Sequence, residues 1–272
     1  MNTRKPIVAG KFYPSTKEEI IEMIENIRSK EKIDYTLKDE LIIGGVVPHA
    51  GYMFSAYEAI HFFELIKENT YDTVIIINPN HTGYGEAISL SGYDYWETPM
   101  GKVELDKEFI EKLNFPISNI AHQFEHSGEV MLPFLNYYVN KNIKIIPITL
   151  TSQTYENAKK VATQIYKVNQ KLNRKILIIA SSDFTHYQSP EEGKKQDEIV
   201  LNDILNFESK KVYKKVIENK LSICGFGCII TLLEYAKLVT QTPKAKILRK
   251  GNSGDVIPSD EVVDYISILV FK

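Results

Sequence analysis

Four stretches of the chain are apolar at nearly every position, and they constrain the fold more than any other feature. They lie at 41–47, 73–77, 143–150 and 175–180. Strands that are apolar on both faces are typical of a sheet covered by helices on each side. Helical patterns separate them at 54–68, 128–140 and 154–172. The alternation predicts an α/β fold with a central, mostly parallel or mixed sheet flanked by helices.

The rest of the chain extends this pattern at both ends. Residues 15–18 have the form of a capping box, and isoleucines then recur at helical spacing, which predicts a helix over 16–30. Further helices are expected at 193–206, 209–219 and 226–239, and strands near 244–249 and 262–270. Residues 94–101 indicate an exposed loop or hairpin. Without an internal repeat or a linker rich in Pro, Gly or Ser, the sequence predicts a single domain over 1–272.

Composition excludes several classes of function. Lys and Arg number 33 against 35 Asp and Glu, a net charge of −2 without the basic excess of a nucleic-acid binder. The densest cationic cluster, at 210–215, is expected to be a solvated helix face. The longest stretch without a formal charge, 41–57, is interrupted by Gly and Pro and is too short to span a membrane. With only two cysteines and no apolar signal segment in 1–14, we expect a soluble, cytoplasmic protein.

Polar residues follow three of the buried strands. His49 follows the first, His81 follows the second, and Asp183 and His186 follow the strand at 175–180. In open α/β sheets the carboxyl ends of parallel strands line the ligand crevice. One histidine after a strand is commonly a turn residue or a satisfied cap, but three at equivalent strand ends favour a shared metal or catalytic site.

The other histidines differ in their surroundings. His126 lies in a polar segment just before a predicted helix, and it deserves the same scrutiny as the strand-end residues. His61, inside an apolar run, is expected to lie in the core or on a helix surface, and His122 has no partner pattern. Glu129 could cap the helix that follows or hydrogen-bond a ligand histidine.

The two cysteines are also expected to differ. Cys224 lies just before a predicted helix, where the positive end of the helix dipole favours thiolate, which is a nucleophile and a soft metal ligand. Cys228 is expected to face the core. Their spacing is not that of a redox or zinc Cys-x-x-Cys motif. A phosphate-binding loop, a dinucleotide fingerprint and a Gly-x-Ser-x-Gly elbow are all absent from the sequence, which weighs against nucleotide-driven and α/β-hydrolase chemistry.

The motifs, in this order, resemble the Memo family, whose bacterial and archaeal members are called AmmeMemoRadiSam system protein B. The matching stretches are VAGKFYP at 8–14, VPHAGY at 47–52, NPNH at 78–81, TPMG at 98–101, EHSGE at 125–129, LPFL at 132–135, SSDFTH at 181–186 and ICG at 223–225. The resemblance covers nearly the whole chain.

The resemblance implies a fold shared with class III extradiol dioxygenases, which hold non-haem iron through two histidines and a glutamate. It implies a metal site at His49, His81 and Cys224, with cysteine in place of the glutamate. His186 matches the acid/base histidine, and Asp183 lies beside it. A His/His/thiolate set is softer than two histidines and a carboxylate, so iron or copper is expected and zinc would also suit.

Two classes of function follow. The first is a metal-dependent oxidoreductase with dioxygen or a small molecule as substrate, in which His186 moves protons and Asp183 and Glu129 orient the histidines. The second is a binding or adaptor protein that reuses the pocket to recognise a peptide or partner. The family name also implies radical SAM and AMMECR-type proteins as partners.

Overall fold

Four parallel strands, β7, β3, β8 and β2, form the centre of the sheet. The computed structural model describes residues 1–33, 41–139 and 142–272, and within them the sheet runs in the order β1-β5-β6-β7-β3-β8-β2-β11-β10. The strands are β1 (Thr3–Arg4), β2 (Ile42–Val47), β3 (Thr73–Pro79), β4 (Ile88–Leu90), β5 (Tyr95–Thr98), β6 (Gly101–Leu105), β7 (Lys144–Leu150), β8 (Ile176–Ser181), β9 (His186–Gln188), β10 (Lys244–Asn252) and β11 (Val262–Phe271).

The sheet is mixed because antiparallel strands flank its parallel centre. β11 pairs antiparallel with both β2 and β10, and β5 pairs antiparallel with β6 in a hairpin. β4 and β9 lie off the main path, on β7 and β11. The α/β class and the mixed sheet are confirmed. Residues 94–101 contain β5, the turn and the first residue of β6, so the hairpin is confirmed, but the expected exposure is wrong at Trp96 and Thr98, which are buried.

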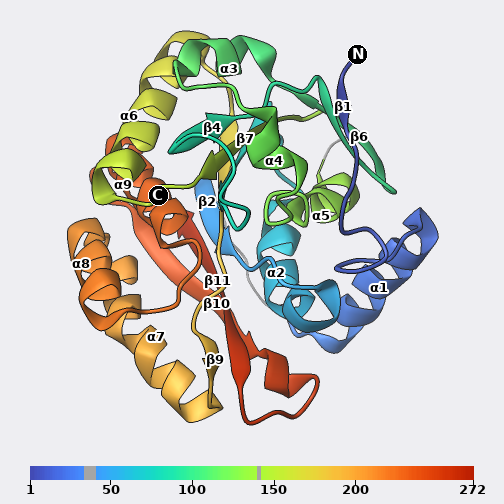
Figure 1. Ribbon diagram of the computed structural model, residues 1–272, viewed down its shortest axis with the longest axis vertical. Coiled ribbons are helices and arrows are strands. Elements are labelled where there is room, and N and C mark those ends of the chain that lie inside the picture. The colour runs from blue at the N-terminus through green and yellow to red at the C-terminus, as the bar shows by residue number, and fades with distance from the viewer. Residues whose placement is uncertain (34–40, 140–141) are drawn as a thin grey trace.

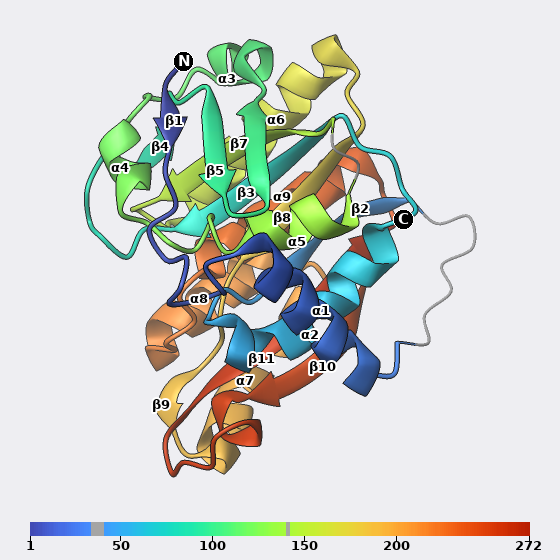
Figure 2. The same ribbon diagram turned by 90° about the vertical axis from the view of Figure 1, so that its right-hand side faces the viewer.

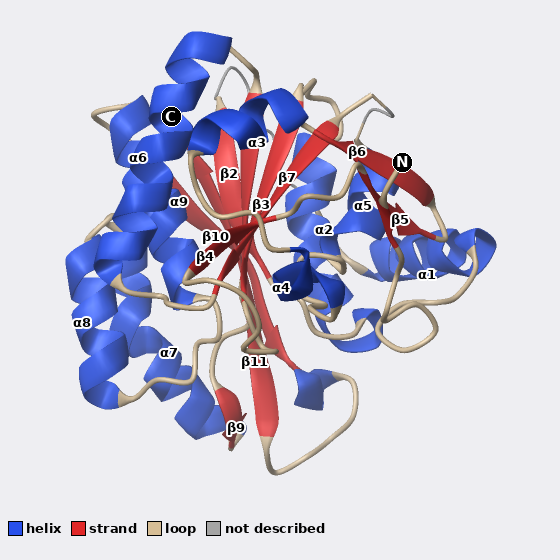
Figure 3. Cartoon of the chain, turned by 45° about the horizontal axis from the view of Figure 1, so that its top comes forward, coloured by secondary structure: helices blue, strands red, loops and turns tan. Residues whose placement is uncertain are grey.

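Helices cover both faces of this sheet. They are α1 (Lys17–Lys30), α2 (Tyr52–Ile66), α3 (Lys107–Leu113), α4 (Asn119–Gln123), α5 (Met131–Tyr138), α6 (Tyr155–Leu172), α7 (Pro190–Leu205), α8 (Ser209–Asn219) and α9 (Phe226–Val239), with a 3-10 turn η1 at Ser253–Asp255. Figures 1 and 2 show α1, α2 and α5 grouped on one side of the sheet, and Figure 3 shows α6, α8 and α9 on the other. None of the helices in the described residues is both long and apolar enough to cross a bilayer.

Several helix starts differ from the prediction, and α2 begins at Tyr52 rather than 54. The cap of α1 is Thr16 rather than Ser15, because the Thr16 hydroxyl accepts the backbone N–H of Glu19. α7 begins at Pro190 rather than 193, since Ser189 caps it and proline suits the first helical position. The helix predicted over 128–140 begins only at Met131 and ends at Tyr138; residue 140 lies outside the described residues.

The core packs tightly against β2, the strand that leads to His49. A Cβ on Gly45 would lie 2.3 Å from the ring of Phe62 in α2, so glycine lets this helix approach β2 closely. Every residue of β2 and β3 is buried, which explains the continuous apolar runs in the sequence. This packing fixes the carboxyl ends of β2, β3 and β8, where the polar motifs begin.

Candidate metal centre

Three adjacent strands end at one place in the sheet. β8 pairs in parallel register with both β2 and β3, so their carboxyl ends lie side by side. His49 comes two residues after β2, His81 two residues after β3, and Asp183 two residues after β8. The structure therefore brings His49, His81 and Asp183, which the sequence singled out, to one edge of the sheet.

Three imidazoles meet at this edge and could hold a metal ion. The candidate ligand atoms of His49, His81 and His126 all lie within 4.8 Å of one another. Their ring centroids are 5.2 Å (His49–His81), 5.6 Å (His49–His126) and 4.7 Å (His81–His126) apart. His126 comes from the turn between α4 and α5. The resemblance implied Cys224 as the third ligand. In the structure the third member of this group is His126, and Cys224 lies beside His49.

The hydrogen bonds of His49 fix its tautomer. Nδ1 lies 2.8 Å from Ser181 Oγ, and that hydroxyl donates to the carbonyl of Ser127 at 2.9 Å. With its proton committed to Ser127, the hydroxyl must accept from Nδ1–H, which leaves the lone pair of His49 Nε2 for a ligand. Burial lowers the pKa of His49 well below its usual value, helped by the charges of the neighbouring histidines. The ring is therefore neutral, as a metal ligand must be.

Glu125 orients His81 and neighbours His126. Glu125 Oε1 lies 2.9 Å from His81 Nδ1 and 3.5 Å from His126 Nδ1, and Oε2 accepts the backbone N–H of His81 at 2.5 Å. Burial alone would raise the pKa of Glu125, but hydrogen bonds from His81 and Ser127 outweigh it and hold the pKa at about 2. Burial alone would lower the pKa of His81, but the Glu125 carboxylate outweighs burial and raises it. A carboxylate behind a histidine is the common support of a metal-bound imidazole.

Cys224 lies against His49, and its burial disfavours the thiolate. Sγ is 3.3 Å from His49 Nε2 and accepts the backbone N–H of Asp183 at 3.2 Å. Burial raises the pKa of Cys224 well above its usual value, and the nearby Asp183 adds to this. Burial therefore raises the pKa of this thiol, contrary to the expectation that the following helix favours thiolate. A bound metal would reverse this, since a coordinating thiol loses its proton.

Asp183 and His186 occupy the same loop with different surroundings. Asp183 is buried, and its Oδ1 accepts the backbone N–H of His49 at 2.8 Å. Burial raises the pKa of Asp183 to about 6, although that hydrogen bond and the charges of the neighbouring histidines lower it. His186 is half-buried, with Nδ1 2.6 Å from the carbonyl of Phe184 and 2.8 Å from that of Ser222. Nδ1 therefore donates, and Nε2 remains available to exchange a proton.

Glu129 has surroundings that neither sequence-based alternative foresaw. Val130 occupies the N-cap position of α5 and makes no side-chain capping hydrogen bond, so Glu129 does not cap this helix. The Glu129 carboxylate instead accepts from Arg4 Nη1 at 2.6 Å, from the Tyr13 hydroxyl at 2.6 Å and from the backbone N–H groups of Ile7 and Val8. It ties the N-terminal segment to the site loop, and its catalytic role stays a prediction.

Arg4 completes this tie and was not anticipated in the sequence. It is buried over the ring of Trp96, 4.4 Å from its centroid. Its guanidinium donates to the carbonyl oxygens of His122 and Glu125 at 2.7 and 2.6 Å. Arg4 therefore holds the segment that carries Glu125 and His126. Phe12, further along the N-terminal segment, packs on His126 with ring centroids 4.8 Å apart.

His61, His122 and Cys228 lie outside the histidine cluster and are buried within the fold. His61 is buried, with Nε2 2.9 Å from Glu31. His122 is buried between the carbonyl of Ser89 and the hydroxyl of Thr149, and burial lowers its pKa to about 3. Cys228 is fully buried in the core, as expected.

Comparison with known proteins identifies the family of this chain. A family model described as "Memo-like protein" matches residues 4–269. The chain belongs to the Memo family. A MEMO1 family protein from Archaeoglobus fulgidus is 39% identical over 269 residues, covering 98% of each chain. One from Methanocaldococcus jannaschii is 40% identical over 286 residues, again covering 98% of each.

Other Memo relatives and a more distant structure complete the comparison. A MEMO1 family protein from Methanosarcina mazei is 37% identical over 274 residues, covering 99% of this chain and all of its own. An uncharacterized protein from Escherichia coli K12 superposes with a TM-score of 0.46 at 12% identity, over 75% of this chain and 90% of its own. Membership of the Memo family is consistent with the dioxygenase-like α/β fold that the motifs implied.

Proposed function

We propose that this Memo-family protein binds one transition-metal ion at His49, His81 and His126 and acts as a metal-dependent oxidoreductase. The observation that carries the proposal is the convergence of three imidazoles, two of them with Nδ1 held by an oxygen of the protein. Imidazole nitrogens suit iron, copper and zinc, and a neighbouring thiol favours the softer metals among these. Iron or copper is the proposed cofactor, with zinc as the competitor.

Cys224 is proposed as a fourth ligand, or as a replacement for His126. Its sulfur already lies 3.3 Å from the nitrogen of His49 that faces the centre. Glu125 holds His126 less firmly than His81, because its Oε1 lies 3.5 Å from His126 Nδ1 and 2.9 Å from His81 Nδ1. Removing each residue separately decides between them.

The bound metal would supply a redox-active Lewis acid that takes dioxygen or a small substrate. The chain's own groups would hold and move protons around it. His186, with Nδ1 committed to backbone carbonyls, is proposed as the acid/base at Nε2. Asp183 is proposed to position His49 through its backbone N–H, and Glu125 is proposed to position His81.

The test is the metal content of protein purified without oxygen, measured by mass spectrometry for wild type and variants. We expect about one iron or copper ion per chain, lost in His49→Ala and kept in the control His61→Gln. Comparison of His126→Ala and Cys224→Ala, with Cys228→Ala as the matched cysteine control, identifies the third ligand. If the wild type takes up no iron, copper or zinc even on reconstitution, the proposal is wrong and recognition of a peptide or partner becomes the better explanation.

Oxygen consumption by the metal-loaded protein tests the redox part separately. The expected result is turnover with a reducing substrate that falls in His186→Gln while metal content is unchanged. Stoichiometric metal without oxygen chemistry would leave the site as a metal site and remove the oxidoreductase role.

A further inference from the structure

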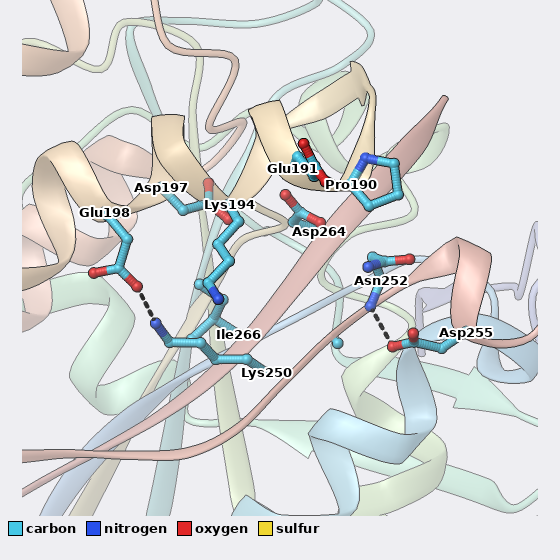
Figure 4. A pocket seen from close by; sticks show the side chains of 11 residues that line it. Pro190, Glu191, Lys194, Asp197, Glu198, Lys250, Asn252, Asp255, Asp264 and Ile266 are labelled. Carbon is cyan, nitrogen blue, oxygen red and sulfur yellow. Dashed lines mark hydrogen bonds and ion pairs between the residues drawn. The ribbon is translucent and has the colours of Figure 1, made fainter. Parts of the chain in front are cut away.

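A cavity of about 460 Å³ lies between α7, β10, β11 and η1. It contains none of the histidines described above, and its size is in the range of small-molecule sites. Figure 4 shows the side chains of α7 on one side and those of β10 and η1 on the other, with Asp264 and Lys194 between them. Its lining gives it a definite chemical character.

Negative charge dominates this lining. The carboxyl groups are those of Glu191, Asp197, Glu198, Asp255 and Asp264, and the ammonium groups are those of Lys194 and Lys250. Lys250 is already paired with Glu198, at 2.6 Å. Such an excess of carboxylates over ammonium groups attracts cations.

Two of the carboxyl groups are buried against each other. Asp197 is 3% exposed and Asp264 is 6% exposed, and burial together with the neighbouring Asp197 carboxyl group raises the pKa of Asp264. Asp197 Oδ1 also accepts the backbone N–H and the hydroxyl of Thr185, at 3.1 and 2.7 Å. Asp264 Oδ2 is buried without a hydrogen-bond donor among the described residues. Two carboxyl groups this close cannot both ionise cheaply without a cation.

Glycine in α7 makes room for this arrangement. A Cβ at Gly193 would lie 2.2 Å from Asp264 Oδ2. Glycine inside a helix costs about 1 kcal/mol relative to alanine, and Gly193 lies in the first turns of α7. The helix therefore carries a destabilising residue at the point where the Asp264 carboxyl group approaches it.

We propose that this cavity binds a small molecule carrying a protonated amine, with the ammonium group held by Asp197 and Asp264. An ammonium group offers three N–H donors and a positive charge. The donors match Asp264 Oδ2, which has no hydrogen-bond donor among the described residues, and the charge matches the negative lining. Ile266 and Pro190 also line the cavity and provide apolar contact for an alkyl chain attached to the amine. The proposal does not depend on the metal centre.

A metal ion fits this cavity less well than an amine. Within the described residues, the only group of three or more His, Cys, Asp or Glu side chains that converges on a metal position is the histidine cluster. A hard cation such as Ca²⁺ takes six to eight oxygen ligands, whereas two carboxyl groups converge here. The cavity is also far larger than an ion, and Lys194 and Lys250 share it.

The experiment titrates the whole protein with putrescine at pH 8 and low salt, by calorimetry and by amide chemical shifts. We expect saturable 1:1 binding with shifts at α7 and β11, and no saturable binding of 1,4-butanediol, its neutral isostere. Asp264→Asn should weaken putrescine binding at least tenfold, while Glu111→Gln, an equal loss of charge on α3, should leave it unchanged. Lys194→Gln should tighten binding, because it removes a competing positive charge; this gain could not come from a damaged fold.

Several results would overturn the proposal. These are no saturable putrescine binding by the wild type, equal binding by Asp264→Asn that retains its fold, or equal binding of 1,4-butanediol. Binding of Mg²⁺ at the same resonances without binding of putrescine would also reject it, and would make the cavity a metal site instead.

Discussion

Glu125 holds His81 by both its backbone and its ring. One carboxylate oxygen accepts the backbone N–H of His81 at 2.5 Å and the other lies 2.9 Å from Nδ1. Because the carboxylate fixes both the position and the rotation of the ring, His81 presents Nε2 to the centre of the histidine cluster. The same carboxylate accepts from Ser127, so the loop after α4 and the end of β3 are held together.

Glu125→Gln should weaken metal binding by about 10–100-fold, the usual cost of losing the carboxylate behind a ligand histidine. The amide keeps the shape but loses the negative charge that makes His81 more basic. Competition with a chromophoric chelator measures the change, and Glu111→Gln on α3 is the matched control. Unchanged affinity in Glu125→Gln would show that the charge of Glu125 has no part in the site.

Arg4→Met should destabilise the fold by about 3–5 kcal/mol, the usual cost of leaving one partner of a buried ion pair unpaired. Arg4 and Glu129 are 2% and 0% exposed, so the lone carboxylate would have no access to water. Urea unfolding at pH 7.5 measures the loss. Lys211→Met, which removes the exposed pair with Glu208, should change the free energy of unfolding by less than about 0.5 kcal/mol.

The double variant Arg4→Met/Glu129→Gln separates the structural from the catalytic role of Glu129. It should recover part of the stability lost in Arg4→Met, because the buried charge is gone. If Glu129 acts only by holding the N-terminal segment, the folded double variant keeps its metal and its turnover. Loss of turnover at full metal content would support the catalytic role instead.

Cys224 in metal-free protein should react slowly with iodoacetamide at pH 8. Burial raises its pKa, so the thiolate fraction is smaller than that of an ordinary cysteine, and the rate should keep rising with pH beyond 9. Alkylation followed by mass spectrometry in a Cys228→Ala background isolates this thiol. A rate that levels off below pH 7 would mean that the helix dipole prevails after all.

Asp264→Asn should stabilise the protein at pH 8 by at least about 1 kcal/mol, given that one pKa unit corresponds to about 1.4 kcal/mol. Burial and the neighbouring carboxyl group raise the pKa of Asp264 to about 7, and burial raises that of Asp197 to about 6. Between about pH 4 and 7 the native state therefore binds more protons than the unfolded state, so stability falls as the pH rises through this range. The asparagine amide can donate to Asp197 at any pH.

Thermal unfolding from pH 4 to pH 8 measures this difference. The gain of Asp264→Asn over wild type should be largest at pH 8 and should shrink towards pH 4, where both carboxyl groups are protonated. An equal gain at both ends of the range would show that the pair does not titrate as a unit.

The sheet and its polar edge could be predicted from sequence because both depend on local pattern. Strands buried on both faces are apolar at every position, and His49, His81 and Asp183 follow β2, β3 and β8 at the same distance. The short elements β4, α3 and α4 were not predicted, because 3- to 7-residue segments carry too little periodicity to be distinguished from loops.

The contacts around the histidines could not be predicted in the same way. Glu125 and Glu129 lie in one motif, and only the path of the turn decides that Glu125 faces His81 while Glu129 faces Arg4. Arg4 and Glu129 are 125 positions apart, and no sequence pattern joins them. The state of the Cys224 thiol depends on burial, which outweighs the helix position visible in the sequence.

The place of β11 has a consequence for how the chain is made. The last strand, Val262–Phe271, lies between β2 and β10, and Leu41 exchanges backbone hydrogen bonds with Lys272. Until Val262–Phe271 has been synthesised and has paired, the strand that leads to His49 therefore has an unpaired edge. Contacts this distant in sequence form slowly, so the loop that carries His49 should become ordered late in folding.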